Sequence, residues 1–367
     1  MNINGTAHRT ISLDESDSEV PLVYTIDQRF LPHELRRIAL KTSNDVATAI
    51  EEMWLRGAPL IGAAAALGFY LGLREADPAT WDRDIKKLTD KLLRTRPTAV
   101  NLHWAVARQL TAIEKGVSYD EKIGIARQTA LDIIEEDVAI CKQIGEHGLK
   151  IIEYISNQKS KKIVNVLTHC NAGWLACIDW GTATAPIYLA HQKGIAIHVW
   201  VDETRPRMQG SITAYELAQQ GVPHTVISDN TGGLLLQQGL VDLCIVGTDR
   251  TTRTGDVANK IGTYLKALAA HDNNVPFYVA LPSHTFDFSI SNGLTDIPIE
   301  TRSEQEVLEV QGVHAGELKT VRLFPTGTRA LNYGFDITPA RLITGLITER
   351  GVCEANEEAI KAMFPQA

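Results

Sequence analysis

Two side chains that can take part in proton transfer follow short apolar segments of this sequence. Asp249 comes after residues 241–247, and Cys170 comes after residues 163–167. Both segments are short and rich in β-branched residues, which predicts buried strands. Ligands of open α/β sheets bind at the carboxyl ends of strands. A partly desolvated aspartate there can act as acid and base near neutral pH, and a thiol near backbone N–H groups has a lowered pKa.

Each of these two residues also has a purely structural interpretation. Asp249 can cap a helix or pair with a neighbouring arginine, and Cys170 can be a small buried hydrophobe. His169 alone predicts a turn or core histidine rather than a catalyst. Cys177 and Cys244 lie in apolar segments, so both are predicted to belong to the core.

Arginines beside two predicted helix ends are candidates for binding an anion. Arg56, Gly57 and Ala58 precede Pro59, a residue that suits the first turn of a helix. Backbone N–H groups at a helix start, together with a guanidinium, suit a phosphate group. The alternative is a helix–helix turn with a surface arginine. Arg96 is a second candidate anion contact, although basic residues also favour helix C-termini because of the dipole.

Further candidates lie in the second half of the chain. Residues 259–270 have the apolar spacing of a helix, which places Asn259 and Lys260 at a helix start that can bind an anion. In the loop 202–210, Arg205 and Gln209 can contact ligand hydroxyls and phosphate, or the loop can be a solvated rim. Gly232 lies in a Gly-Gly pair that is a weaker phosphate signal.

The order of elements predicts an α/β protein with two domains. Residues 1–150 form a mainly helical domain with a small sheet, and residues 151–367 alternate between short strands and helices. That alternation is typical of βαβ units and of a Rossmann-like parallel sheet covered on both faces. Strands are predicted at 21–27, 163–167, 195–201, 223–227, 241–247 and 277–281, and a short helix and strand within 337–351.

Composition excludes several classes of protein. The net charge of −8 argues against nucleic acid as the main partner. It is compatible with a small phosphorylated ligand, which needs only a local basic pocket. Residues 1–18 are polar and do not predict a signal peptide, and the longest apolar stretch, 58–73, is too short and too rich in glycine to span a membrane. The five cysteines are scattered, which predicts reduced thiols in the cytoplasm rather than disulfides or a zinc site. No nucleotide-binding or metal-binding motif is present, so neither a cofactor nor a metal is expected.

Four segments together resemble the methylthioribose-1-phosphate isomerase family, which belongs to the superfamily of the initiation factor 2B regulatory subunits. The resemblance runs from about Tyr24 to Thr348, with its motifs in order. The segments are residues 56–59, 168–173, 202–210 and 255–263.

The resemblance implies an aldose–ketose isomerase of the methionine salvage pathway, acting on a sugar phosphate as a homodimer. It implies that Asp249 is the acid/base aspartate and Cys170 the cysteine of the catalytic site. The regulatory relatives are not expected to keep that pair. The substrate contacts that it implies are Arg56, Gly57, Ala58, Arg96, Gln209, Asn259 and Lys260.

Two positions depart from the family's pattern. Leu60 stands where alanine is common, which is a matter of packing, and Trp174 stands where a small residue is expected. A bulky ring near the site reshapes the pocket for the 5-substituent of the sugar. A 5-deoxyribose 1-phosphate, another phosphorylated pentose such as ribose 1,5-bisphosphate, and a non-catalytic binding role are the alternatives.

Overall fold

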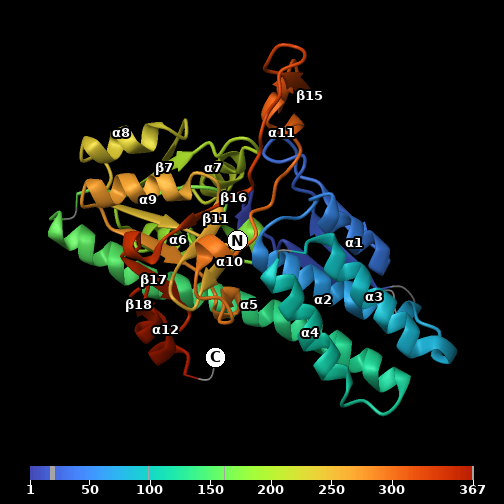
Figure 1. Cartoon of the computed structure of the whole chain (residues 1–367). Coiled ribbons are helices and arrows are strands. Elements are labelled where there is room, and N and C mark those ends of the chain that lie inside the picture. Colours follow the sequence, from blue (N-terminus) through green and yellow to red (C-terminus); the bar gives the residue numbers. More distant parts are fainter. Residues whose placement is uncertain (17–20, 98, 161, 366–367) are drawn as a thin grey trace. The chain divides into compact units, whose positions relative to one another are not determined.

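The chain folds into two compact units that do not follow one cut of the sequence. The computed structural model describes residues 1–16, 21–97, 99–160 and 162–365 (Figure 1). The first unit contains Met1–Lys142 and Trp174–Gly181, and the second contains Gln143–Gly173 and Thr182–Ala367. The domain boundary predicted at residue 150 falls inside the long helix α5 (Tyr119–Gln158).

The first unit combines a small antiparallel sheet with a group of helices, as predicted. The sheet has the order β3-β4-β5, and a separate short pair is formed by β1 and β2. The bounds of these elements are β1 (Asn2–Ile3), β2 (Thr6–Ala7), β3 (Ile11–Asp14), β4 (Leu22–Ile26), β5 (Arg37–Leu40), α1 (Ser43–Glu51), α2 (Ala58–Glu75), α3 (Trp81–Thr95) and α4 (Val100–Ile113).

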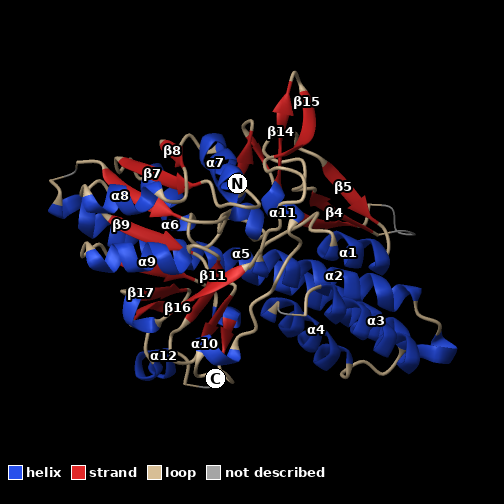
Figure 2. Cartoon of the chain, turned by 45° about the horizontal axis from the view of Figure 1, so that its top comes forward, coloured by secondary structure: helices blue, strands red, loops and turns tan. Residues whose placement is uncertain are grey.

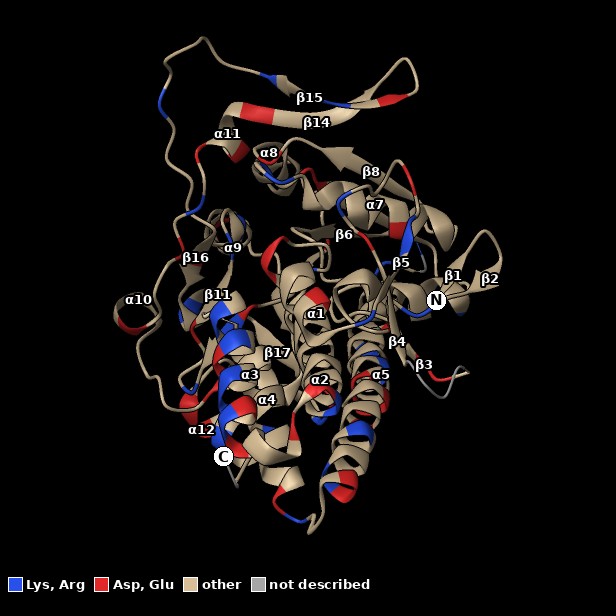
Figure 3. Ribbon diagram, turned by 90° about the vertical axis from the view of Figure 1, so that its right-hand side faces the viewer, with Lys and Arg blue, Asp and Glu red and all other residues tan. Residues whose placement is uncertain are grey.

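Helix α2 is the buried centre of this unit. Its residues from 60 to 73 are all buried, and they include no charged side chain. Three glycines let neighbouring helices come close: a Cβ on Gly62 would lie 3.0 Å from a backbone oxygen of α4, and Cβ atoms on Gly68 and Gly72 would lie 2.8 Å and 2.4 Å from side chains of α1 and α3. By contrast, α3 carries many charged residues along its length (Figure 3). The small residues of α2 therefore let its neighbours pack closely against it.

The second unit is built on a sheet of seven strands, β18-β17-β12-β9-β6-β7-β8 (Figure 2). All neighbours pair in parallel except β17 and β18. The six parallel strands follow the chain in the spatial order 3-2-1-4-5-6, which is that of doubly wound nucleotide-binding folds. The strands are β6 (Val164–Thr168), β7 (Ile197–Asp202), β8 (His224–Ile227), β9 (Leu243–Val246), β12 (Phe277–Ala280), β17 (Gly345–Thr348) and β18 (Gly351–Cys353).

Helices connect these strands, as expected for βαβ units. Helices α8 and α9 pack side by side (Figure 1). The predicted α/β class is confirmed, because every strand predicted after residue 160 has a counterpart in the sheet. The helices of this unit are α6 (Ala185–Gln192), α7 (Gln209–Gln219), α8 (Thr231–Gln237), α9 (Thr263–Asp272), α10 (Gly293–Asp296), α11 (Gln305–Leu308) and α12 (Glu357–Met363).

A second sheet and a hairpin were not predicted. The second sheet has the order β13-β10-β11-β16, and the hairpin β14–β15 extends from the rest of its unit (Figures 1 and 2). The tail was predicted as a short helix and strand, but its first part is the strand β16, and a 3-10 turn precedes β17. The bounds are β10 (Arg250–Thr252), β11 (Val257–Lys260), β13 (Phe286–Asp287), β14 (Glu309–His314), β15 (Glu317–Arg322) and β16 (Phe335–Thr338).

The helix predicted from Asn259 is wrong in its first turn. Asn259 and Lys260 end strand β11, which pairs antiparallel with β16, and helix α9 begins only at Thr263. Gly262 separates the two elements with φ +104°, a conformation that glycine adopts without the strain of a side chain. A four-residue strand joined to a helix by one short turn keeps the apolar spacing of a single helix, so periodicity alone could not separate them. Among the described residues, no helix is both long and apolar enough to cross a bilayer.

Two glycines of helix α5 predict opposite effects of the same substitution. A Cβ on Gly148 would lie 2.4 Å from Cγ of Pro186, whereas a Cβ on exposed Gly124 would meet no atom within 4 Å. Alanine favours a helix by about 1 kcal/mol over glycine. We expect Gly124→Ala to raise the free energy of unfolding by about 0.5–1 kcal/mol and Gly148→Ala to lower it by about 1–3 kcal/mol because of overpacking. Urea unfolding followed by circular dichroism measures both, and an equal gain in the two variants would contradict the close packing at Gly148.

Candidate active site

The two candidate catalytic residues of the second unit follow neighbouring strands of its sheet. Cys170 lies two residues after β6, and Asp249 lies three residues after β9. These strands pair directly, with Val166 opposite Leu243. The strand order reverses between β6 and β9, because β7 and β8 extend to one side and β12 and β17 to the other. Such a reversal point opens a crevice at the carboxyl ends of the strands, where doubly wound folds bind their ligands.

Strand β11 brings Lys260 to the same region. The backbone N–H of Asp249 donates to the carbonyl of Ala258 over 3.0 Å, which fixes the Asp249 backbone beside the strand that ends at Lys260. Lys260 is only 7% exposed, and its ammonium lies 5.7 Å from the centre of the Phe335 ring. Burial lowers the pKa of Lys260, while the nearby Cys170 and Asp249 act to raise it. The Lys260 ammonium thus interacts electrostatically with both Cys170 and Asp249.

Asn259 contributes to the turn that follows Lys260. Its amide donates to Oγ1 of Thr263 over 3.0 Å, and that hydroxyl donates to the carbonyl of Lys260 over 2.7 Å. The start of helix α9 already holds an anion, because the Asp336 carboxylate accepts the N–H groups of Gly262 (2.7 Å) and Tyr264 (3.1 Å). Burial raises the pKa of Asp336, and these two hydrogen bonds oppose that rise. The anion site expected at a helix start therefore has its place taken by Asp336, a residue that the sequence interpretation missed.

Gln209 is the first residue of helix α7 and offers an unused acceptor. Its side chain is 9% exposed, and its Oε1 atom has no hydrogen-bond partner among the described residues. Gly210 follows it so close to the end of β7 that a Cβ would lie 1.9 Å from the carbonyl oxygen of Asp202. A buried amide oxygen without a partner costs free energy, and a ligand hydroxyl can satisfy it.

Cys170 differs from the other cysteines of the chain in its backbone, and from Cys141, Cys177 and Cys244 in its exposure. Its φ is +69°, a conformation that is strained for a residue with a side chain. Cys170 is partly exposed, whereas Cys177 and Cys244 are buried, as predicted. Burial raises the pKa of the Cys353 thiol to about 11, which keeps it protonated at neutral pH.

Two arginines that follow Asp249 in the sequence each contact a carboxylate of another segment. Arg250 Nη1 lies 3.5 Å from Oδ2 of Asp287, and Arg253 Nε lies 3.3 Å from Oε1 of Glu357.

The other predicted site residues belong to the first unit. Arg56, Gly57 and Ala58 form the turn into helix α2, and Gly57 is its N-cap with φ +111°. A Cβ there would lie 2.2 Å from the carbonyl oxygen of Ala176, so only glycine fits. Arg96 is the C-cap of helix α3. The convergence of these residues with Cys170 and Asp249 on one substrate remains a prediction.

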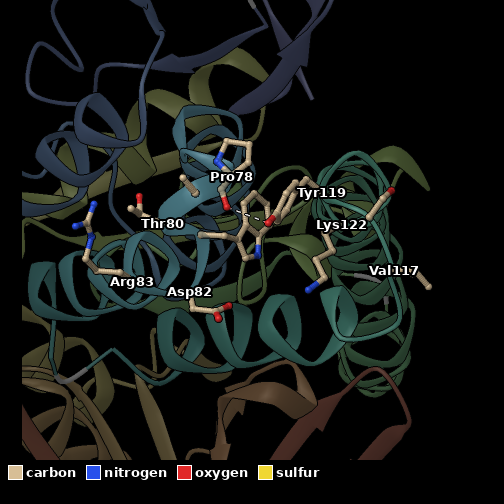
Figure 4. Close-up of a pocket in the computed structure, with 10 residues that line it drawn as sticks. Pro78, Thr80, Asp82, Arg83, Val117, Tyr119 and Lys122 are labelled. Carbon is tan, nitrogen blue, oxygen red and sulfur yellow. Dashed lines mark hydrogen bonds between the residues drawn. The ribbon is translucent and has the colours of Figure 1, made fainter.

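Trp174 is part of the first unit's core. Its side chain is fully buried, and its carbonyl accepts the hydroxyl of Thr10 over 2.9 Å. A surface pocket of the same unit lies elsewhere in the sequence, around residues 78–83 and 117–122 (Figure 4). The Tyr119 hydroxyl donates to the carbonyl of Pro78 at its edge, over 2.9 Å. None of the residues predicted from the sequence lines this pocket.

Two groups of potential metal ligands occur among the described residues. In the second unit, His169, Asp202 and Asp229 converge, but the Lys266 ammonium lies 3.3 Å from Asp202 Oδ2 and donates to the carbonyl of Asp229. That ammonium supplies the positive charge a metal would bring. The absence of a metal from the reaction stays a prediction from the sequence.

The second group lies in the first unit and consists of Asp137, Cys141 and Cys177, all buried. Oδ2 of Asp137 accepts the N–H of Ile178 over 3.2 Å, while Oδ1 has no partner among the described residues. Burial raises the pKa of Asp137 to about 7. An acid in this state is largely protonated at mildly acidic pH, so the group is stable without a cation there.

Comparison with known proteins agrees with this architecture. Residues 55–355 match the model of the initiation factor 2 subunit family. The chain is 56% identical over 367 residues to a methylthioribose-1-phosphate isomerase of Desulfatibacillum aliphaticivorans, covering 100% of this chain and 99% of that protein. It is 54% identical to the protein of the same name from Escherichia coli O45:K1 (strain S88 / ExPEC), covering 99% and 96%.

Solved structures give the same picture. The 5-methylthioribose 1-phosphate isomerase of Pyrococcus horikoshii OT3 superposes with a TM-score of 0.84 at 35% identity, covering 100% of both chains. A structure described as subunit delta of translation initiation factor eIF-2B from A. fulgidus superposes with a TM-score of 0.79 at 36% identity, covering 98% of this chain and 100% of that one. The chain therefore belongs to the initiation factor 2 subunit family and, within it, to the methylthioribose-1-phosphate isomerases.

The buried acid Asp137 predicts a specific pH dependence of stability. Burial raises its pKa from 3.8, the value expected in the unfolded chain, to about 7 in the folded protein. Between pH 3.8 and about pH 7 the folded state therefore binds more protons at this group than the unfolded state does. Stability must then fall as pH rises through this window, and Asp137→Asn removes that loss. We expect the variant to gain about 2–4 kcal/mol relative to the native protein between pH 4.5 and pH 7.5. Urea unfolding at several pH values measures the difference, and a difference that does not change with pH would contradict the assignment.

Proposed function

We propose that this chain converts S-methyl-5-thioribose 1-phosphate to S-methyl-5-thioribulose 1-phosphate, an aldose–ketose isomerisation of methionine salvage. The observation that carries the proposal is identity of 56% and 54%, over nearly the whole chain, to proteins named for this activity. The presence of both Cys170 and Asp249 after neighbouring strands supports it, because the pair is what the resemblance implies for the enzyme.

The chemistry begins with ring opening. The 1-phosphate of the substrate blocks spontaneous opening of the furanose, so an acid has to protonate the ring oxygen. Asp249 is proposed for that role, because a carboxyl group at a strand end beside a thiol and an ammonium can exchange protons with a bound sugar. Hydrogen then moves from C2 to C1, either as a proton through an enediol or as a hydride, and Cys170 assists this transfer.

Cationic groups are proposed to hold the phosphate. The ammonium of Lys260 is buried and desolvated, which lowers its pKa, and a dianionic phosphate would favour its charged form. Arg56 and Arg96 are proposed to share the phosphate, together with backbone N–H groups at Gly57 and Ala58. The amides of Gln209 and Asn259 complete the contacts.

The proposal extends to the assembly and its location. A homodimer is proposed from the family resemblance, and a cytoplasmic enzyme from the five cysteines, none of which is paired in a disulfide. The substrate is a small phosphorylated sugar, consistent with a net charge of −8 that does not suit nucleic acid.

A regulatory or binding role is the competing function. Its support is the 36% identity to the structure described as an eIF-2B delta subunit. The isomerases of Desulfatibacillum aliphaticivorans and Escherichia coli are more similar, at 56% and 54% identity, so the enzyme is favoured. Assays with 5-deoxyribose 1-phosphate and ribose 1,5-bisphosphate beside the methylthio substrate separate the other candidate sugars, and no turnover of any of them by the native protein would favour the binding role.

Asp249→Asn and Cys170→Ser test the two catalytic assignments. Loss of a positioned acid or base typically costs about 10²–10⁴ in rate, so we expect kcat to fall at least about 100-fold in each variant. Cys353→Ser is the matched control, since it changes a partly buried thiol outside the proposed site and should keep native kcat. Steady-state kinetics on methylthioribose 1-phosphate decide the point, and near-native rates in either test variant would remove that residue from the mechanism.

The route of hydrogen transfer is tested with substrate that carries deuterium at C2. Turnover in ordinary water by an exchanging enediol washes the label out, whereas transfer as a hydride keeps it on C1 of the product. We expect one of these two patterns, read by mass spectrometry of the product. Complete retention opposes an exchanging enediol, and washout opposes the hydride route.

A further inference from the structure

His169 connects the two segments that carry Cys170 and Lys260. Its Nδ1 atom lies 2.8 Å from Oδ2 of Asp202, and its Nε2 atom lies 2.9 Å from the carbonyl oxygen of Ile261. Cys170 is the next residue after His169, and Lys260 is the residue before Ile261. The His169 imidazole therefore links the segment that carries Cys170 to the segment that carries Lys260.

The ring rests on a buried charged group. His169 is 1% exposed and Asp202 is 0% exposed, and the Lys266 ammonium lies 3.3 Å from the same carboxylate oxygen. Both ring nitrogens face oxygen acceptors, so each must carry a hydrogen, or Asp202 must hold the second proton. Either arrangement loses a buried hydrogen bond when the ring turns away, which fixes its orientation.

Close packing prevents the ring from shifting. A Cβ on Gly262 would lie 3.0 Å from Cε1 of His169, which is tighter than ordinary side-chain contact. Gly262 has φ +104°, so a residue with a side chain would be both strained and crowded there. The turn after Lys260 and the imidazole thus fit against each other at the point where the Ile261 hydrogen bond forms.

Two threonines hold the backbone of Cys170 from its other side. The N–H of Cys170 donates to Oγ1 of Thr204 over 2.9 Å, and Oγ1 of Thr213 donates to the carbonyl of Cys170 over 2.8 Å. Thr204 is fixed in turn by Asp229, whose Oδ1 accepts the Thr204 N–H over 2.8 Å. These bonds hold the backbone of Cys170, and the His169–Ile261 hydrogen bond links it to the segment that carries Lys260.

We propose that His169 is a positioning residue of this enzyme, which sets the distance between the Cys170 thiol and the Lys260 ammonium through its hydrogen bond to Ile261. The proposal rests on the proposed isomerase function. It assigns a role to a histidine that the sequence alone predicts to be a turn or core residue. Misplacement of reacting groups by about 1 Å can cost about 100-fold in rate, so a residue that touches no substrate can still govern kcat.

Two substitutions separate the two hydrogen bonds of the ring. In His169→Gln, the amide can reach the place of Nε2 and keep the Ile261 bond. In His169→Asn, the shorter amide can reach the place of Nδ1 and keep the Asp202 contact. Both variants remove the aromatic ring and change the same position, so a general effect of mutating the core applies to both alike.

We expect kcat of His169→Gln to exceed that of His169→Asn by at least about tenfold, with KM changed less than kcat. A ratio within about threefold of unity overturns the proposal, whether both variants are active or both are inactive. Thermal melting of both variants is the control, because a merely structural role predicts losses of kcat that follow the melting temperatures. If His169→Asn does not fold, His169→Gln alone decides: a loss of more than about fivefold from native kcat overturns the proposal.

A second readout does not need turnover. Alkylation of Cys170 by iodoacetamide, followed by mass spectrometry of its peptide, reports how readily the thiol is activated by the neighbouring ammonium. We expect alkylation of Cys170 to be slower in His169→Asn than in His169→Gln. Equal rates would contradict the proposal that the hydrogen bond to Ile261 positions Cys170 relative to Lys260. A native protein that turns over no sugar phosphate would refute the proposed function, and the alkylation ratio would then judge this inference by itself.

Discussion

The pairing of β6 with β9 is the contact on which the proposed chemistry of the second unit depends. Backbone hydrogen bonds hold these two parallel strands side by side, and the connections leave them in opposite directions across the sheet. No helix or loop has to cover the point where the order reverses, so the carboxyl ends of both strands stay open to a ligand. Cys170 and Asp249 follow these strands, although 79 positions separate them in the chain. Pairing within the parallel sheet therefore places Cys170 and Asp249 at the ends of neighbouring strands despite their separation in the sequence.

The groups beside this opening are fixed by buried charges rather than by apolar packing alone. Asp202, Lys266 and His169 are almost completely buried, the Asp202 carboxylate contacts both of the others, and Asp336 holds the start of helix α9. Burying such groups is costly unless each has a partner, and each of these has at least one. These groups fix the geometry of their surroundings, because hydrogen bonds between charged groups are shorter and more directional than contacts between apolar side chains. The backbone of Cys170, at φ +69°, is an example of a strained conformation that its surroundings maintain.

The fold of the initiation factor 2 subunit family is shared by proteins with different functions, so the fold alone does not identify the function of this chain. A protein described as a translation factor subunit and a protein described as an isomerase both superpose on this chain with high TM-scores. A shared fold is compatible with unrelated functions, so the choice between them rests on the higher identity to named isomerases and on the residues of the proposed site. In this chain the proposed site has Cys170, Asp249 and the buried Lys260 at or just after the ends of strands, and we propose that these groups carry out the reaction.

The sequence by itself determined the α/β class, the central strands and the positions of Cys170 and Asp249 at strand ends, because apolar periodicity is a local property. It failed at residues 259–263, where the end of a strand and the start of a helix share one apolar pattern and only a partner strand, β16, distinguishes them. It predicted His169 to be a turn or core histidine, which burial of its side chain confirms, but it did not predict the two oxygen acceptors 33 and 92 positions away. Tertiary structure alone decided these points, since hydrogen bonds between distant segments leave no periodic signal in the chain.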